Sequence, residues 1–359
     1  KLLTGSTPKP SSSFEFFPGV PLYHSTNLVD WEQLGYVLTR ESQLPLQGCR
    51  PSGGIFAPTL RHHDGRFYMI TTNTHPTDKP AGNFYVWTDD IHAEWSDPVW
   101  LEMGGIDPDL FFDDDGSVWF TSTDGQRQID LETGTFLGEP ITRWPGTPDS
   151  ASPEGPHIYK INGTYYTMLA EGGTEPGHMV TIARSDQLGG PFEPCPHNPI
   201  LTQRSKKGRV MSTGHADMVQ DPNGNWWMVF LGVRKLDYPS LHLLGRETFL
   251  APVTWTEEGW PVVNEGKILT FEVDTPLLPE QKPAWTTWAD DFAATELKRE
   301  WNFIRNPNPD NWSLTESPGQ LTLHCSRIGL DDWESPAWIG RRLQHFSTQQ
   351  LVTLDFIPE

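Results

Sequence analysis

Residues 152–166 read SPEGPHIYKINGTYY, and this stretch decides the fold that we predict. Its one carboxylate, Glu154, precedes a Gly-Pro pair and two runs of β-prone residues that Asn162-Gly163 separates. Asn-Gly between such runs favours a tight hairpin, because both central residues of a type I′ turn need a positive φ. Taken alone, the stretch is also typical of an ordinary surface hairpin with a solvated glutamate.

The hairpin pattern occurs four times along the chain, which the surface-hairpin interpretation does not explain. The turns end in Gly65, Gly116, Gly163 and Gly224, at spacings of 51, 47 and 61 residues, and an aromatic-rich run follows each turn. A period of this size with several strands per repeat predicts propeller blades of roughly four strands. Residues 20–37 add a fifth outer half-blade that no hairpin precedes. We therefore expect an all-β chain with a five-bladed β-propeller whose first blade lacks its inner hairpin.

Four side chains occupy the same place in these repeats. Phe56, Asp107, Glu154 and His215 each lie nine residues before the turn glycine of their repeat. The innermost strand of a propeller blade starts beside the central axis, so these residues are predicted to converge at one mouth of the channel. Two carboxylates, a histidine and an aromatic ring at one axis are typical of a glycosidase site.

Structural alternatives stay open for the polar members of this set. Asp107 with Pro108 also suits a plain turn, Glu154 a solvated loop, and His215 a structural histidine of the channel. The run Asp113-Asp114-Asp115 resembles a calcium motif. It falls in a hairpin turn, and we interpret it as solvated.

Composition divides the chain into four parts, which are an irregular segment at 1–13, the propeller at 14–274, a Pro-rich linker at 275–287 and a last part at 288–359. In the last part, residues 320–324 and 351–356 alternate as strands do. About 70 residues fall short of the roughly 100 that a complete β-sandwich contains. We therefore expect a truncated, incomplete sandwich that leans on the propeller.

Charge and composition exclude several classes of partner. The formal net charge of −21 argues against nucleic acid and against an anionic membrane surface. The sequence contains no run of about 18 apolar residues, so we expect no membrane span. Cys49, Cys195 and Cys325 form no metal or redox motif. An extracellular location is expected, although residues 1–13 do not have the pattern of a signal peptide.

Six short motifs give the chain a resemblance to a known family. They are FEFFPG at residues 14–19, GIFAP at 54–58, IDP at 106–108, EGPH at 154–157, GHA at 214–216 and LGRET at 244–248. Together and in this order they resemble family 43 glycoside hydrolases, in particular the β-xylosidase branch with a C-terminal sandwich. The resemblance runs from residue 12 to the end of the chain.

The resemblance implies a five-bladed propeller that hydrolyses xylosides or arabinofuranosides with inversion and requires no cofactor. It assigns Glu154 as the general acid, and Asp107 as the residue that raises the pKa of Glu154 and orients it. It also implies a calcium ion or an ordered water in the channel near His215. The pocket for the terminal sugar would be lined by Phe14, Phe56, His215 and Arg246.

The chain departs from the family's pattern in three places. The family's general base is an aspartate in an Asn-Pro-Asp-Pro-Ser motif upstream of residue 14, and this motif is absent here. Many relatives carry Trp where Phe56 stands, and relatives have a longer sandwich. We therefore expect that the base is missing and that turnover by this chain is impaired. Arg246 is also compatible with a plain ion pair to Glu247 or another carboxylate.

Our leading hypothesis is an exo-acting hydrolase of xylo-oligosaccharides or arabinoxylan. The alternative is a catalytically inactive sugar-binding propeller, which the missing base favours. A propeller that serves only as a protein-interaction platform would not need Asp107, Glu154 and Arg246 in the family's register.

Overall fold

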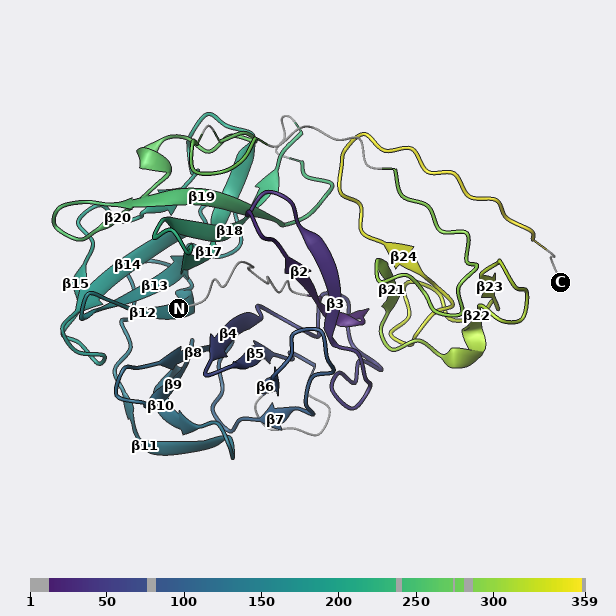
Figure 1. The fold of residues 1–359 in the computed structure, drawn as a ribbon, viewed down its shortest axis with the longest axis horizontal. Coiled ribbons are helices and arrows are strands. Elements are labelled where there is room, and N and C mark those ends of the chain that lie inside the picture. The colour runs from purple at the N-terminus through teal and green to yellow at the C-terminus, as the bar shows by residue number, and fades with distance from the viewer. Residues whose placement is uncertain (1–12, 76–81, 237–240, 274, 281–286, 357–359) are drawn as a thin grey trace.

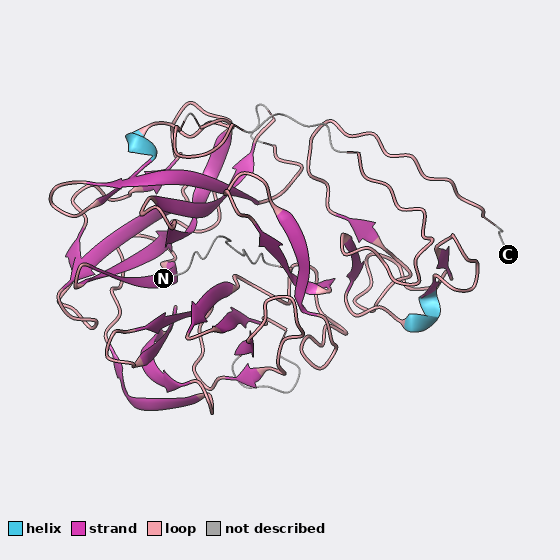
Figure 2. Cartoon of the chain, viewed as in Figure 1, coloured by secondary structure: helices cyan, strands magenta, loops and turns pink. Residues whose placement is uncertain are grey.

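The structure is a computed structural model, and it describes residues 13–75, 82–236, 241–273, 275–280 and 287–356. Its regular elements in these ranges are strands and two short 3₁₀-helices, so the predicted all-β fold class is confirmed (Figure 2). None of the helices in the described ranges is long or apolar enough to cross a membrane.

Five sheets surround a common axis as the blades of a propeller (Figure 1). In the second, third and fifth blades the strands are paired antiparallel in chain order, and in the fourth blade β15 and β16 both pair with β14. The second blade holds β4 (Thr59–His63), β5 (Arg66–Thr72), β6 (Asn83–Thr88) and β7 (Val99–Trp100). The third holds β8 (Asp109–Phe112), β9 (Val118–Ser122), β10 (Gly125–Asp130) and β11 (Thr135–Ile141). The fourth holds β12 (Glu154–Ile161), β13 (Thr164–Glu171), β14 (Met179–Ser185), β15 (Glu193–Pro194) and β16 (Leu201–Thr202). The fifth holds β17 (Val210–Gln220), β18 (Trp226–Arg234), β19 (Glu247–Trp255) and β20 (Pro261–Val263).

The first blade is smaller than the others. It consists of β2 (Gly19–His24) and β3 (Glu32–Leu38), and no inner hairpin joins this sheet within the described residues. The sequence contains five outer half-blades but only four hairpin patterns, and this difference predicted the two-stranded blade.

The four predicted hairpin turns are present, but they are of two kinds. Asn162 and Gly163 both have a positive φ (51° and 84°), as a type I′ turn requires, and the turn at Gly65 is alike. At Gly116 and Gly224 only the glycine has a positive φ. In these two turns the glycine N–H donates to the main-chain carbonyl of the aspartate three residues earlier, so the loop is longer than two residues.

The hydrophobic core lies between neighbouring blades. Met168 and Ile182 of the fourth blade pack with Met228 and Phe230 of the fifth, and all four are 2% exposed or less. Full burial of such side chains stabilises the fold by roughly 1.5–3 kcal/mol each. The packed faces fix the angle between blades and thereby the positions of the inner strands.

The C-terminal part contains few paired residues and leans on the first blade. Its elements are β21 (Trp301–Ile304), η2 (Pro309–Asn311), β22 (Trp312–Ser313), β23 (Thr322–Leu323) and β24 (Gly340–Arg341). Two further elements lie outside it, which are β1 (Phe16–Phe17) near the N-terminus and η1 (Asn264–Gly266) after the last strand of the fifth blade. β21 lies between β1 and β24 in one sheet. The Arg305 side chain donates to the Cys49 carbonyl at 2.6 Å. The domain boundaries stay predictions.

The predicted strand at residues 351–356 is wrong. No residue of this segment pairs with another described strand, and Leu351 is 95% exposed. Alternation of apolar residues specifies which side of a strand faces the core, but a strand forms only where a neighbour completes its hydrogen bonds.

Candidate active site

The inner strands of four blades begin beside one cavity on the propeller axis. The cavity has a volume of about 1530 Å³, and Phe56, Asp107, Glu154 and His215 all line it, as their shared repeat position predicted. One carboxylate oxygen of Asp107, one of Glu154 and one ring nitrogen of His215 lie within 4.8 Å of one another. The plain-turn interpretation of Asp107 and the solvated-loop interpretation of Glu154 are therefore wrong.

The backbone that carries these side chains is held in an uncommon conformation. Asp107 (φ 57°) and His215 (φ 47°) are left-handed, which residues with a side chain rarely are. Gly155 follows Glu154 with φ 59°, and a Cβ on it would lie 2.8 Å from the His215 ring. Glycine at 155 therefore allows the imidazole to pack against the strand that carries Glu154.

The environment of Glu154 suits a proton donor. Burial raises the pKa of the Glu154 carboxyl above its ordinary value; His215 and Arg246 act to lower this pKa, and Asp107 acts to raise it. Asp107 thus acts in the direction that the resemblance implied, although burial has the larger effect. A raised pKa favours the protonated carboxyl, which is the form that can protonate a leaving group as a general acid.

Asp107 is itself buried, with 5% of its surface exposed. Burial raises its pKa to about 6, against the opposing effects of the Gly155 N–H, His157 and Arg246. Its Oδ2 atom makes no hydrogen bond to a described residue. Asp107 is therefore placed to influence its neighbours through its charge rather than to approach a substrate.

Replacing Asp107 with asparagine is expected to lower the pKa of Glu154, because a like charge nearby disfavours ionisation of a carboxyl. NMR titration of the Glu154 carboxyl in both proteins measures this change. Replacement of the exposed Asp186 by asparagine is the matched control. An unchanged or higher pKa of Glu154 in the Asp107 variant would contradict the assigned role.

The same replacement is expected to change how stability depends on pH. The folded chain holds the Asp107 proton with a pKa of about 6, whereas the ordinary value is 3.8. Between these values the folded chain binds the proton more tightly than the unfolded chain does, so the free energy of unfolding falls as the pH rises. The loss is on the order of 3 kcal/mol at neutral pH. Calorimetry should show a higher Tm for the Asp107→Asn variant at pH 7 and no such gain at pH 4.

His178 belongs to the site, and the sequence analysis missed it. It lies just before β14, its side chain is fully buried, and its Nε2 atom lies 3.8 Å from Glu154 Oε1. His215 Nδ1 lies at the same 3.8 Å from this oxygen. Burial lowers the pKa of both histidines to about 4, so both rings are neutral above that pH. The two rings contribute to the burial of the Glu154 carboxyl, and burial is the largest cause of its raised pKa.

No repeat position or motif marks His178, because it lies just before β14 and reaches Glu154 on β12 across the sheet of the same blade. Its ring also packs against the fifth blade. A glycine opposite it shows how close that packing is. A Cβ on Gly214 would lie 2.5 Å from the His178 ring.

We expect Gly214→Ala to displace His178 and to destabilise the chain. Overpacking of this kind costs typically 1–3 kcal/mol. Calorimetry measures the fall in Tm. Gly208→Ala is the matched control, since a Cβ there would meet its neighbours at 3.5 Å or more. Equal Tm values for the two variants would show that the contact between Gly214 and His178 is not tight.

Phe14, Phe56 and Arg246 form one side of the pocket. The Phe14 and Phe56 rings meet edge to face with centres 5.8 Å apart, and the Arg246 guanidinium carbon lies 5.3 Å from the centre of the Phe14 ring. Phe14 is held by two backbone hydrogen bonds with Ile55, of 3.0 and 3.1 Å. The segment that carries Phe14 is thus fixed against the second blade.

The ion pair between Arg246 and Glu247 that the sequence left open is not formed. Arg234 binds both carboxylate oxygens of Glu247 instead, at 2.8 and 2.7 Å. Arg246 forms no ion pair with any described residue. Burial lowers its pKa while Glu154 and Asp107 act to raise it, and its guanidinium stays available to a ligand in the cavity.

The calcium ion near His215 stays a prediction, and the surrounding residues fit it poorly. Asp107, Glu154 and His215 offer two carboxylates and one imidazole, whereas Ca²⁺ takes 6–8 oxygen ligands. Arg61 places a guanidinium on the same cavity.

In the run Asp113-Asp114-Asp115, only Asp113 is less solvated than predicted, and the other two aspartates are exposed. Asp113 is 9% exposed and accepts hydrogen bonds from Lys160 Nζ at 2.6 Å and from the Tyr165 hydroxyl at 2.7 Å. Asp114 lies 3.1 Å from the same Nζ. This run ties two hairpins together through Lys160.

Comparison with known proteins covers nearly the whole chain. Residues 10–261 match the family model of glycosyl hydrolases family 43, and residues 289–359 match that of the beta xylosidase C-terminal concanavalin A-like domain. A non-reducing end alpha-L-arabinofuranosidase of Bacteroides ovatus is 42% identical over an alignment of 377 positions that covers 100% of this chain and 70% of the relative. A xylosidase/arabinosidase of Butyrivibrio fibrisolvens is 43% identical over 97% of this chain and 70% of its own length. The solved structure of a xylan beta-1,4-xylosidase from Bacillus halodurans superposes with a TM-score of 0.89 at 35% identity, over 96% of this chain and 69% of that one.

Proposed function

This chain belongs to glycosyl hydrolase family 43, and from that premise we propose that it releases terminal xylose or arabinofuranose from xylo-oligosaccharides or arabinoxylan with inversion. That it is a glycosidase follows from the family. The choice of sugar rests on the names of the relatives, a xylosidase/arabinosidase among them. The observation that carries the proposal is the Glu154 carboxyl, which has a raised pKa and lies beside Asp107 at the start of the inner strands.

The roles follow from the surroundings of each side chain. Glu154 donates its proton to the leaving oxygen of the substrate, while Asp107 disfavours the ionised form of Glu154. Arg246 presents fixed donors to the sugar hydroxyls. The rings of Phe14 and Phe56 offer apolar surface to the sugar.

The separation of the two carboxyls bears on the stereochemistry. The acid and base of an inverting enzyme stand roughly 6.5–9.5 Å apart, whereas the pair in a retaining enzyme stands about 5–5.5 Å apart. Asp107 and Glu154 are within 4.8 Å, so Asp107 is too close to be the base of an inverting pair. Its 5% exposure also keeps it from attacking a sugar. We therefore propose that it is neither base nor nucleophile.

The identity of the general base stays a prediction, because the base of an inverting pair lies roughly 6.5–9.5 Å from the acid and thus outside the group of atoms around Glu154 that lie within 4.8 Å of one another. Among the described residues, this group consists of Asp107, Glu154 and His215. Impaired turnover by this chain stays a prediction, and a sugar-binding propeller stays the alternative function.

Product analysis by ¹H NMR tests the proposal. The 359-residue chain is incubated with 2,4-dinitrophenyl xyloside and with the corresponding arabinofuranoside, with and without azide or formate. Release of the sugar with inverted configuration, or of the inverted glycosyl azide when azide replaces water as the nucleophile, at a rate that the added anion raises, supports an inverting enzyme that lacks its own base. A retained product would overturn the proposal and make Asp107 a nucleophile. Binding of xylose without turnover in any condition would favour the sugar-binding alternative.

A further inference from the structure

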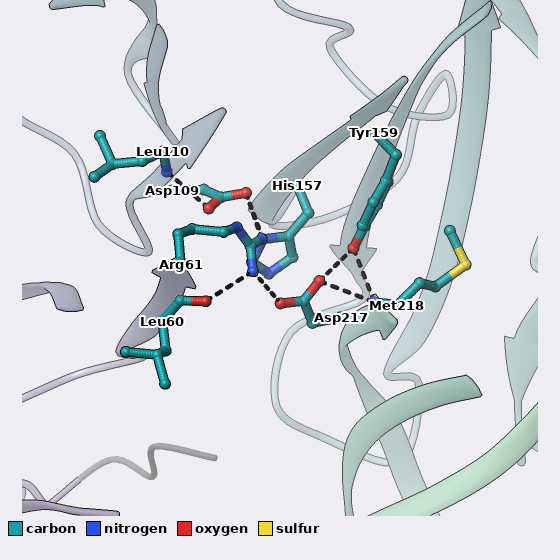
Figure 3. Close-up of polar contacts among 8 residues, drawn as sticks. All are labelled: Leu60, Arg61, Asp109, Leu110, His157, Tyr159, Asp217 and Met218. Atoms are coloured by element: carbon teal, nitrogen blue, oxygen red, sulfur yellow. Dashed lines mark hydrogen bonds and ion pairs between the residues drawn. The ribbon is translucent and has the colours of Figure 1, made fainter. Parts of the chain in front are cut away.

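A second layer of polar side chains crosses the propeller axis next to the candidate active site (Figure 3). Asp109 follows Asp107 by two residues, and Asp217 follows His215 by two. Arg61, His157 and Asp217 line the same cavity as the active-site residues. The two layers are therefore carried by the same inner strands, and a movement in one layer is passed to the other.

Arg61 on β4 is the centre of this second layer. Its Nη2 atom lies 2.8 Å from Asp109 Oδ2 on β8, and its Nη1 atom lies 2.7 Å from Asp217 Oδ2 on β17. Nη2 also lies 3.2 Å from Nδ1 of His157 on β12. One guanidinium thus contacts the inner strands of three other blades. A planar fork of donors can hold two carboxylates at once in a way that a single ammonium cannot.

The partners of Arg61 are in turn held by further contacts. His157 Nδ1 lies 2.9 Å from Asp109 Oδ2. Asp217 Oδ1 accepts from the Tyr159 hydroxyl at 2.6 Å and from the Met218 N–H at 2.9 Å. Both carboxylates therefore have several donors, and the cluster is a connected network rather than one ion pair.

The charges of this network balance within the protein. Burial acts to raise the pKa of Asp217, but Arg61 and His157 outweigh it and hold that pKa well below the usual range. Burial acts to lower the pKa of His157, but Asp217 and Asp109 outweigh it and raise that pKa. The network joins charged groups that depend on one another, so removal of the guanidinium leaves two carboxylates in mutual repulsion.

The active-site layer needs an external support of this kind. The strand pairing of β12 is interrupted between Glu154 and His157, and that of β17 between Gly214 and Asp217. The ladder therefore holds Glu154 through a single pair, opposite Ala170 on β13, and a bulge separates this pair from the regular ladder that starts at His157. Left-handed backbone of the kind at Asp107 persists only where the surroundings over-determine it.

We propose that Arg61 is a positioning residue for the general acid: by joining β4, β8, β12 and β17 across the axis, its guanidinium sets the separations among Asp107, Glu154 and His215. This inference rests on the proposed function of Glu154 as the acid. Arg61 itself does not touch the substrate or the transferred proton.

Arg61→Ala is tested on two xylosides that differ only in their leaving group. Xylobiose needs protonation of its leaving oxygen, whereas 2,4-dinitrophenyl xyloside does not, so a misplaced acid affects xylobiose alone. We expect the variant to lose about tenfold more kcat on xylobiose than on the dinitrophenyl substrate, with KM changing less than kcat. Guanidinium added at millimolar concentration is expected to restore part of the loss on xylobiose.

Arg66→Ala is the matched control, because Arg66 on the adjoining strand binds the exposed Asp89 at 2.6 Å and lies outside the cavity. It is expected to leave the ratio of the two substrates unchanged, with and without guanidinium. If Arg61→Ala does not fold, Tyr159→Phe replaces it, since this change removes one donor to Asp217 and leaves the ring in place. A smaller loss of the same selectivity is expected.

Equal losses on the two substrates, with a lowered Tm and no rescue by guanidinium, would show that Arg61 only stabilises the fold. A crystal structure of the variant gives a readout without turnover, and unchanged separations within the 4.8 Å cluster would also overturn the inference. A parent chain that hydrolyses neither substrate would instead count against the proposed function, while the separations in the variant still test the role of Arg61.

Discussion

Replacing Glu154 with glutamine is expected to lower kcat/KM on xylobiose by about 10²–10⁴-fold, the usual contribution of a general acid. Glutamine has the shape of glutamate but carries no acidic proton. The loss on 2,4-dinitrophenyl xyloside is expected to be far smaller, because that leaving group departs as a stable anion. Steady-state kinetics on both substrates measure the difference.

The pH profile of the same variant provides a second measurement. In the parent chain the acid must be protonated, so activity falls as the pH rises through the raised pKa of Glu154. This alkaline fall is expected to disappear in the variant. Glu193→Gln is the control, since Glu193 is 62% exposed and binds Arg184 on the surface of the same blade. A variant at Glu154 with parental activity on xylobiose would exclude this residue as the acid.

Replacing Arg246 with alanine is expected to weaken the binding of xylose by roughly 10–100-fold, because hydrogen bonds to a charged group contribute about 1.5–3 kcal/mol. Arg246 forms no ion pair with a described residue, so its donors are free to bind the sugar. Isothermal titration calorimetry with xylose and with arabinose measures the change. Arg246→Lys is expected to be intermediate, because an ammonium keeps the charge but lacks the planar fork.

Loss of Arg246 is also expected to move the alkaline limb of activity to higher pH, because its positive charge acts to lower the pKa of Glu154. Arg184→Ala is the matched control, since Arg184 binds Glu193 outside the cavity. Unchanged sugar affinity in the Arg246 variant would place this guanidinium outside the binding site.

Turn chemistry carried most of the fold prediction. Asn162-Gly163 and its three counterparts marked the hairpins, and equal offsets from the turn glycines placed Glu154 and Asp107 on one cavity. This succeeded because tight turns depend on local backbone preferences, which a sequence expresses directly. The strand expected at residues 351–356 failed because pairing is not local.

The rest of the site could not be predicted from spacing alone. His178 reaches Glu154 from the start of β14, across the sheet of the same blade, and no local pattern encodes this contact. Part of the Arg61 network did leave a signal. Asp109 and Asp217 each lie seven residues before a turn glycine, and two carboxylates at one repeat position of buried strands indicate a buried partner of opposite charge. That partner is Arg61, and the other repeats carry Phe112, Tyr159 and Gln220 at the same position, so no repeated cation marks it.

The sheet formed by β1 and β21 limits how modular this protein is. Phe14 of the pocket lies two residues before β1, and β1 pairs with a strand of the C-terminal part. An exchange of the C-terminal part for that of another enzyme would therefore also reset one wall of the sugar pocket. For protein engineering, the propeller and the C-terminal part are therefore best exchanged together. Substitutions in β21, which is far from Glu154 in the sequence, are expected to alter substrate preference through Phe14.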